Sequence, residues 1–307
     1  MPSTLMPSFS IRRVTQCLIT AFALWIPTNR AAAVLRLTPE GETRIPAFLI
    51  DGQPVRIHSQ GLYVTERFFF VTGRLEQSPK RALFLRISRS NPAEIEHVDI
   101  TPRPDTAHRE DPADHPGGFD FDGTHFWIPI SPSKPNSHAL IVRFQHDPDS
   151  PLHEHRAETM FTFSDHIGAL AIHSEKSRLM GVNWDAKTIY TWSTRGEFIS
   201  AVPLGSLSRS DPETQFAVQD WKHIGSGELL AGGLDKNRTL DSGSPRALVE
   251  IIQLSTRQIV AQGRLPRPAG AAHEVTNEGV ALFDNTLYFL PGDLGSETSI
   301  YTYRWVR

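Results

Sequence analysis

A short strand–turn–strand pattern recurs along this chain with a period of about 50 to 58 residues. Its clearest copy runs from Asn277 to Gly292, where two apolar segments flank the turn Asp284-Asn285. A period near 50 with several short strands per unit is typical of a β-propeller. Blades bury their faces only against one another, so the number of copies sets the number of blades. The aligned positions are Gly61, Gly118, Gly168, Trp221 and Gly279. The sequence therefore predicts an all-β fold, a five-bladed β-propeller.

The last blade needs a strand from elsewhere in the chain. The residues after Gly279 suffice for three strands, whereas a blade has four. We expect an N-terminal strand, from residues 34–38 or 44–50, to close the ring beside the C-terminal strand 299–305. A sixth blade built from residues 34–57 is the alternative, but that segment is too short for four strands and their turns.

The first 33 residues have the composition of an export signal. Arg12 and Arg13 precede an apolar run from Val14 to Pro27, and Ala31-Ala32-Ala33 follows it. This order is typical of a secretory signal peptide, and the apolar run is short for a membrane span. We expect a signal peptide over residues 1–33, a β-propeller over 34–307, and a periplasmic or extracellular protein without a membrane span after cleavage. An uncleaved anchor is the alternative.

Composition narrows the classes of function. The formal net charge is −3 and no basic patch suited to nucleic acid is evident. Cys17 is the only cysteine and lies inside the predicted signal peptide, so disulfides and a thiol nucleophile are not expected. P-loop, dinucleotide-binding and nucleophile-elbow motifs are absent from the sequence. We expect a monomer whose partner is a small molecule in the central funnel or a protein at the rim.

Polar residues directly precede the aligned position in every repeat. In a propeller these positions converge on one mouth of the central channel, and the long segment 102–116 delivers the second of them. Convergent polar groups in a concave site are the usual sign of a binding or active site. The group consists of His58, Gln60, Asp114, His115, Asp165, His166, Gln219, Asp220, Asn277 and Glu278.

These residue types suit two chemistries. His115 and His166 are candidate general bases, because histidine titrates near neutrality. Candidate ligands of an axial divalent metal are His58, Asp220, Asn277 and Glu278, where oxygen ligands favour Ca²⁺ and histidines favour a transition metal. Alternatively, the same side chains satisfy backbone groups and order water in the channel.

Other residues are candidates for ligand contacts. The group comprises Gln60, Asp114, Asp165, Gln219, Trp221 and Lys222. Trp221 is expected either to wall the funnel or to pack in the core. Trp184 and Asp293 follow second strands, so we expect them at the rim, where most acidic side chains are solvated.

The pentapeptide Asn277-Glu278-Gly279-Val280-Ala281 resembles the opening of propellers in the gluconolactonase, strictosidine synthase and esterase-like group. That resemblance implies a divalent metal on the axis, with Glu278 matching its glutamate and Asp220 its aspartate. It also implies hydrolysis of lactones or esters. The group usually has six blades, and His58, His115 and His166 stand at its amide positions. Over its whole length the chain resembles exported single-domain propellers of unassigned activity.

Three functions remain open at this stage. The first is metal-assisted hydrolysis of a small ester or lactone, in which the metal polarises a carbonyl and a histidine acts as general base. The second is a binding protein without catalysis. The third is a glycosidase in which Glu278 pairs with Asp220 or Asp165, because glycosidases use two carboxyl groups at a set separation.

Overall fold

The computed structural model describes residues 32–102, 111–147, 149–207, 209, 213–238, 246–268, 271, 273–296 and 298–306. The predicted signal peptide lies outside these residues except for its last two positions. Most of segment 102–116 also lies outside them. No helix within the described ranges is long and apolar enough to cross a membrane.

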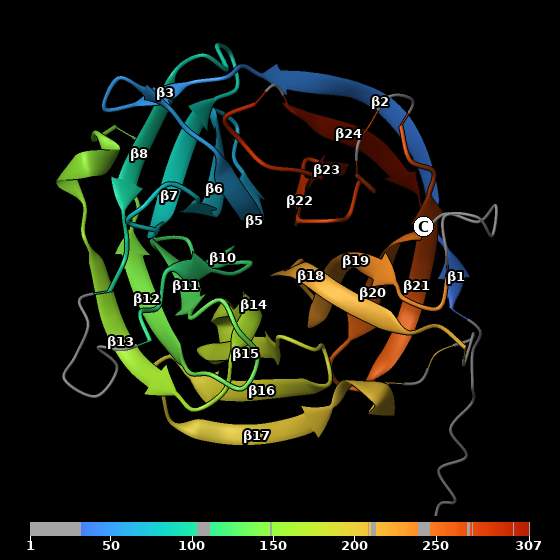
Figure 1. The fold of residues 1–307 in the computed structure, drawn as a ribbon. Coiled ribbons are helices and arrows are strands. Elements are labelled where there is room, and N and C mark those ends of the chain that lie inside the picture. The colour runs from blue at the N-terminus through green and yellow to red at the C-terminus, as the bar shows by residue number, and fades with distance from the viewer. Residues whose placement is uncertain are drawn as a thin grey trace, which may run out of the picture. The chain divides into compact units, whose positions relative to one another are not determined.

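The described chain forms five antiparallel sheets arranged around a common centre (Figure 1), which confirms the predicted five-bladed propeller. Successive repeats build successive blades, and each runs from the centre outward. Blade 1 consists of β5 (Ile57–Val64), β6 (Phe68–Leu75), β7 (Arg81–Ser88) and β8 (Ile95–Asp99). Blade 2 consists of β9 (His115–Pro116), β10 (Asp120–Phe121), β11 (His125–Ser131), β12 (Ala139–Gln145) and β13 (Ala157–Phe163). Blade 3 consists of β14 (Ile167–His173), β15 (Arg178–Asn183), β16 (Thr188–Ser193) and β17 (Phe198–Pro203).

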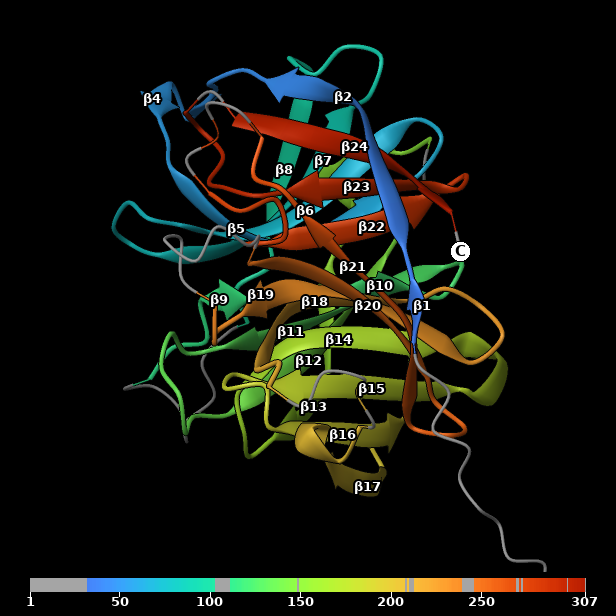
Figure 2. The ribbon, with the colours of Figure 1, turned by 90° about the vertical axis from the view of Figure 1, so that its right-hand side faces the viewer.

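The last two blades recruit strands from the start of the described chain. Strand β2 pairs antiparallel with β24 and completes blade 5, as predicted, and Figure 2 shows it along the outside of β24. Strand β1 adds a parallel fifth strand to blade 4, which the sequence did not predict. Blade 4 consists of β18 (Phe216–His223), β19 (Glu228–Asp235), β20 (Ala247–Gln253), β21 (Gln258–Leu265) and β1 (Ala33–Val34). Blade 5 consists of β22 (Gly279–Phe283), β23 (Thr286–Leu290), β24 (Thr298–Val306) and β2 (Arg36–Ile45).

Minor elements lie within and between the blades. They are the hairpin β3 (Leu49–Ile50) with β4 (Gln53–Pro54), and the 3₁₀ turns η1 (Leu152–Glu154), η2 (Ser174–Lys176) and η3 (Leu204–Ser206). Five buried hydrophobic clusters fill the spaces between adjacent blades. This arrangement is what a sheet with two apolar faces requires.

β-bulges in three innermost strands change by one residue which positions of the repeats are structurally equivalent. The innermost strands of blades 1, 3 and 4 each carry one extra residue, at Gln60, Gly168 and Gln219. A bulge shifts every following side chain to the other face. The residues that correspond structurally to Gly61 are therefore Ala169 and Asp220, and not Gly168 and Trp221. Trp221 faces the hydrophobic cluster between blades 3 and 4 and is fully buried.

Asp220 closes the centre of the ring. Its carboxylate is fully buried and accepts hydrogen bonds from the backbone N–H groups of Leu62 and Val280, both at 3.1 Å. It also accepts one from Lys222 Nζ at 2.5 Å. Since a Cβ on Gly118 would collide with this carboxylate, glycine is required there. Blade 4 is thereby joined to blades 1 and 5.

Asp120 plays the same part for the remaining blades. Its Oδ2 accepts hydrogen bonds from the N–H groups of Ile172 at 3.1 Å and His223 at 2.9 Å, which belong to blades 3 and 4. Burial raises the pKa values of Asp120 and Asp220 to about 6, although the charge of Lys222 opposes this. The two carboxylates thus satisfy inner-strand N–H groups from four blades and leave the funnel with a solid floor.

Candidate functional site

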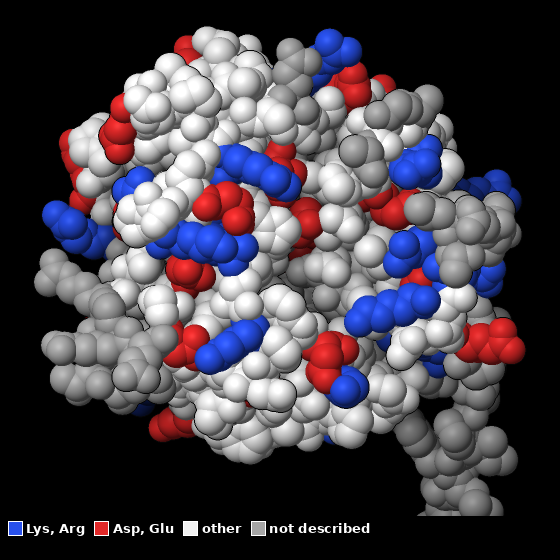
Figure 3. Space-filling model, viewed as in Figure 1, with Lys and Arg blue, Asp and Glu red and all other residues white. Residues whose placement is uncertain are grey.

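A pocket of about 260 Å³ opens where the innermost strands begin, above the level of Asp220. The face seen in Figure 3 has a central hollow around which basic and acidic side chains alternate. The bulges and the residues before them supply much of the lining. The pocket is lined by His58, Gln60, His115, His166, Gly168, Trp184, Ala217, Val218, Gln219, Lys236, Asn277 and Glu278. Seven of the predicted site residues therefore meet in one place, although blades 1, 2, 3, 4 and 5 contribute them separately.

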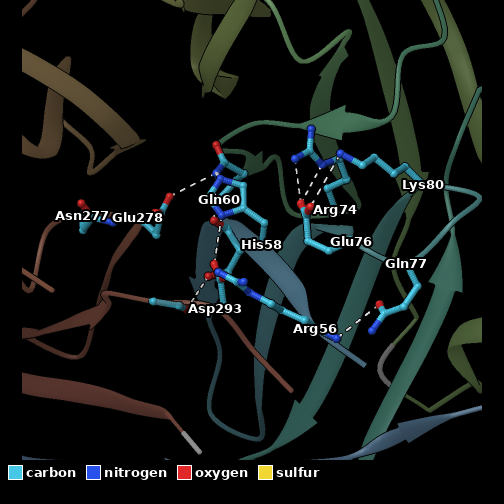
Figure 4. A network of polar contacts seen from close by, with 12 residues as sticks. Arg56, His58, Gln60, Arg74, Glu76, Gln77, Lys80, Asn277, Glu278 and Asp293 are labelled. Atoms are coloured by element: carbon cyan, nitrogen blue, oxygen red, sulfur yellow. Dashed lines mark hydrogen bonds and ion pairs between the residues drawn. The ribbon is translucent and has the colours of Figure 1, made fainter. Parts of the chain in front are cut away.

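His58 is oriented by a carboxylate (Figure 4). Its Nδ1 lies 2.9 Å from Asp293 Oδ1, and Arg56 Nε donates to the other oxygen of Asp293 at 2.7 Å. Burial by itself would raise the pKa of Asp293, but the hydrogen bonds from His58 and Arg56 bring it below its ordinary value. An ionised Asp293 can only accept, so His58 carries its proton on Nδ1. Its Nε2 is then a basic lone pair, 2.9 Å from Gln60 Nε2.

The segment after β23 brings Asp293 to this position. Gly292 O accepts a hydrogen bond from Ser59 Oγ at 2.6 Å, and Ile57 and Leu294 form a backbone bridge at 2.8 and 2.9 Å. The chain of blade 5 thus folds across the beginning of β5. Asp293 was expected at a solvated rim, and the sequence signal for its role is only its place directly after Pro291-Gly292.

Glu278 faces His58 across Gln60. Its Oε2 accepts a hydrogen bond from Gln60 Nε2 at 3.1 Å, and its Oε1 accepts one from Asn277 Nδ2 at 2.7 Å. The side chain is only 7% exposed. Burial, reinforced by the negative charge of Asp293, raises the pKa of Glu278 well above its ordinary value, and the Asn277 hydrogen bond offsets this only in part. The surroundings of Glu278 therefore favour its protonated form more than those of an exposed glutamate do.

His115 and His166 are present in the pocket as neutral rings. Burial lowers the pKa of His115 to about 3, assisted by the charge of Arg74, and lowers that of His166 to about 4. His166 Nδ1 lies 3.0 Å from Lys134 O, to which it donates. His115 Nδ1 is buried without a hydrogen-bond partner. Such weak bases suit hydrogen bonding to a ligand better than the general-base role that the sequence suggested for them.

Trp184 and the histidines form an aromatic wall. The ring of His115 lies 5.6 Å from that of His58 and 6.1 Å from that of His166. The indole of Trp184 lies 4.5 Å from His166 and stays 44% exposed, which leaves a face for a ligand. Trp184 and Lys236 complete the lining, and neither belonged to the predicted group of site residues.

Several predicted site residues lie elsewhere. Asp220 is beneath the pocket floor, Trp221 is in the core, and Lys222 lines a separate pocket of about 500 Å³ at the other end of the inner strands. Asp165 accepts hydrogen bonds from its neighbours at the rim, including Tyr190 Oη at 2.8 Å, and does not line the pocket. Asp114 also lies outside the lining, and burial raises its pKa.

The residues present do not match the expected axial metal site. Asp220 is committed to two backbone N–H groups and Lys222. Both oxygens of Glu278 already accept from amide N–H groups, so Asn277 adds a donor there and not a second oxygen ligand. Among the described residues, no group of three or more His, Cys, Asp or Glu side chains is placed to hold a metal ion.

The fold and the pocket define a class: a five-bladed β-propeller with a polar, partly aromatic pocket at one mouth of its closed channel. Within that class, the chain belongs to the family of unknown function DUF6454, whose sequence pattern matches residues 50–292. A comparison of the sequence with curated proteins finds no match.

Solved structures share the fold at low sequence identity. One is a member of the GH130 family of mannoside phosphorylases, a family that contains glycoside hydrolases targeting β-1,2 mannosidic linkages in Candida mannan. It superposes with a TM-score of 0.56 and 10% identity. The match covers 89% of this chain and 94% of that one. A glycosyl hydrolase from Bacteroides ovatus gives 0.51 and 10%, over 81% and 84% of the two chains. Such identities establish the propeller and nothing finer.

Proposed function

We propose that the pocket hydrolyses a small ester or lactone, with His58 as general base and Glu278 as general acid. The observation that carries this proposal is that His58 Nε2 and Glu278 Oε2 both lie within hydrogen-bond distance of Gln60 Nε2, at 2.9 and 3.1 Å. A base and an acid are thus held a few ångströms apart on either side of one amide, which is the arrangement acid–base catalysis uses.

The step balances without a cofactor. His58 Nε2 takes a proton from water as the water oxygen attacks the carbonyl carbon. The tetrahedral intermediate then collapses, the bond to the alkoxy oxygen breaks, and Glu278 gives its proton to that oxygen. Asp293 stabilises the resulting imidazolium. The proton on His58 then passes through solvent to Glu278, which returns both groups to their starting states. The neutral ring of His115 and the amide of Gln219 are available to donate hydrogen bonds to the developing oxyanion.

The pocket also favours certain substrates. Protonated Glu278, neutral histidines and the nearby Lys236 disfavour a cationic substrate, and the exposed face of Trp184 suits a ring. A volume of about 260 Å³ accommodates a molecule of sugar size. We propose that the activity is located outside the cytoplasm, because residues 1–33 have the pattern of a signal peptide.

The test is a panel of aliphatic lactones, aldonolactones, aryl esters and nitrophenyl glycosides, with turnover and Trp184 fluorescence followed in parallel. Lactone or ester turnover supports the proposal. Saturable fluorescence quenching without turnover of any substrate replaces it with the binding-protein alternative. Turnover of glycosides alone replaces it with glycosidase chemistry.

The axial metal implied by the resemblance has its own measurement. We expect elemental analysis of purified protein to find no stoichiometric metal, and chelator to leave turnover unchanged, because Asp220 is not available as a ligand. If the protein instead holds one metal per chain and Glu278→Ala loses it, the metal-assisted mechanism replaces the one proposed here.

A further inference from the structure

A second pocket, of about 280 Å³, lies between blades 3 and 4 and shares no residue with the funnel. Strands β15, β16 and β17 form one side, and the end of β20 with its following turn forms the other. The floor is apolar and includes Met180, Ile189, Leu207 and Ile252, each no more than 8% exposed. Ile199 lines the same pocket with 45% of its surface exposed, so it extends the apolar surface to the pocket edge.

Three cations surround this apolar floor. Lys176, Arg178 and Arg257 line the same pocket and are exposed. None of them takes part in an ion pair with another described residue at 4.0 Å or less. The acid next to them, Glu175, is 3.7 Å from His173 Nε2. In a chain with a net charge of −3, a cationic rim without carboxylate partners is a local excess of positive charge.

We propose that this interblade pocket binds an amphipathic anion, an alkyl chain of about eight carbons with a carboxylate or sulfate head group. The alkyl chain lies among Met180, Ile189 and Ile252, where burying each methylene is favourable. The head group lies between Arg178 and Arg257, where it meets positive charge and stays solvated. This site is independent of the reaction proposed for the funnel.

Calorimetric titration with sodium octanoate tests the proposal directly. We expect saturable one-to-one binding, and affinity that rises about fourfold per methylene from butanoate to octanoate. Octyl sulfate binds comparably if only the charge is read, whereas octanoate alone binds if a carboxylate is required. Absence of saturable octanoate binding overturns the proposal. Equal binding of octanol or octyltrimethylammonium overturns it as well, because the cations would then play no part.

Surface substitutions locate the site without disturbing the core. Arg178→Gln with Arg257→Gln should weaken octanoate binding at least about fivefold. At the pocket edge, Ile199→Asp should weaken binding, whereas the matched Ile199→Lys should preserve or strengthen it. Glu278→Gln, in the funnel, should leave octanoate affinity unchanged. Binding that is lost in Glu278→Gln, or that ignores the charge placed at Ile199, would refute an interblade site.

Discussion

At the residue scale, the function of the funnel depends on side chains that alter one another's protonation. Glu278 and Asp293 are both carboxylates near the pocket, yet burial leaves the first inclined to hold a proton and hydrogen bonds keep the second ionised. His58 contacts Asp293 directly and is linked to Glu278 through the amide of Gln60. The repeat pattern alone was sufficient to predict that His58, His115, His166 and Glu278 would meet, because one position per blade faces the same mouth.

What the sequence could not predict is the partner of each group. Asp293 reaches His58 only because the segment after β23 crosses to β5 through backbone hydrogen bonds, which leave no side-chain pattern. The low pKa of His115 arises from burial, and the rings that surround it come from blades 1 and 3. Both facts depend on the distances between segments remote in sequence, so periodicity carries no information about them.

Replacing Glu278 tests the proposed acid. We expect Glu278→Gln to lower kcat/KM by about 10²- to 10⁴-fold, the usual contribution of a general acid. The acid works protonated, so wild-type activity should fall as pH rises through the raised pKa of Glu278, and that alkaline limb should vanish in the variant. Steady-state rates from pH 5 to 9 measure both effects.

The matched control is Glu76→Gln. Glu76 accepts a hydrogen bond from Arg74 at 2.7 Å beside the funnel and does not line the pocket, so its rates should stay near wild type. An unchanged pH profile in Glu278→Gln would remove Glu278 from the mechanism.

At the element scale, the innermost strands carry most of what is specific to this chain. Their bulges turn Gln60 and Gln219 toward the pocket and place Asp220 one layer below it. The sequence repeat aligned Gly168 one residue before the position in blade 3 that corresponds to Gly61, and Trp221 one residue after that position in blade 4. The bulges have no common residue signature, since Gln60 and Gln219 are glutamines whereas Gly168 has no side chain, so the register could not be read from the sequence.

The hub carboxylate makes a sharp stability prediction. Asp220→Asn should lower the free energy of unfolding by about 3–5 kcal/mol, because it removes the carboxylate to which the buried ammonium of Lys222 donates directly. Asp220→Asn combined with Lys222→Met should be less destabilised than the single variant. Chemical denaturation followed by fluorescence measures both.

The control is Asp284→Asn. Asp284 lies in an exposed turn with a positive φ, which asparagine also adopts readily, so this variant should leave the free energy of unfolding nearly unchanged. A single variant as stable as wild type would show that the centre of the ring does not depend on this ion pair.

At the scale of the whole molecule, stability depends on closing the ring. The predicted pairing of an N-terminal strand with the C-terminal one is confirmed by β2 and β24, whose register extends from Arg36–Val306 to Ile45–Thr298. This part of the fold could be predicted because the last repeat visibly lacked a strand. The extra strand β1 could not, because two residues give no pattern.

Truncation tests the closure. We expect removal of residues up to Ile45 to leave β24 as an open edge and to yield aggregated or unfolded protein. Removal only up to Val34, which takes away β1, should lower the melting temperature by a few degrees at most. Circular dichroism and size-exclusion chromatography distinguish the two, and a soluble, cooperative protein lacking β2 would contradict this account.

The same molecule should be sensitive to mild acid. Burial lowers the pKa values of His115 to about 3, and of His146 and His166 to about 4, so the unfolded chain binds protons that the native chain does not. Their contribution to stability is complete above pH 6.5 and is lost as pH falls from there toward 4. Asp120 and Asp220, with raised pKa values, oppose this between about pH 6 and 3.8.

Three histidines outweigh two aspartates, so the melting temperature should begin to fall near pH 6.5. His115→Gln should reduce the number of protons taken up on unfolding by about one, so the melting temperature should fall less steeply with decreasing pH. A melting temperature that stays constant from pH 7 to 5 would contradict the assignment of these rings as neutral.

The pairing of β2 with β24 also has a consequence for the order in which the protein matures. A ribosome makes β2 before strands β5 to β23 and β24 after them, so the ring cannot close until β24 has been made. A product released before β24 is made keeps an open edge in the last blade. Quality-control proteases would therefore find a recognisable difference between complete chains and those that stopped short.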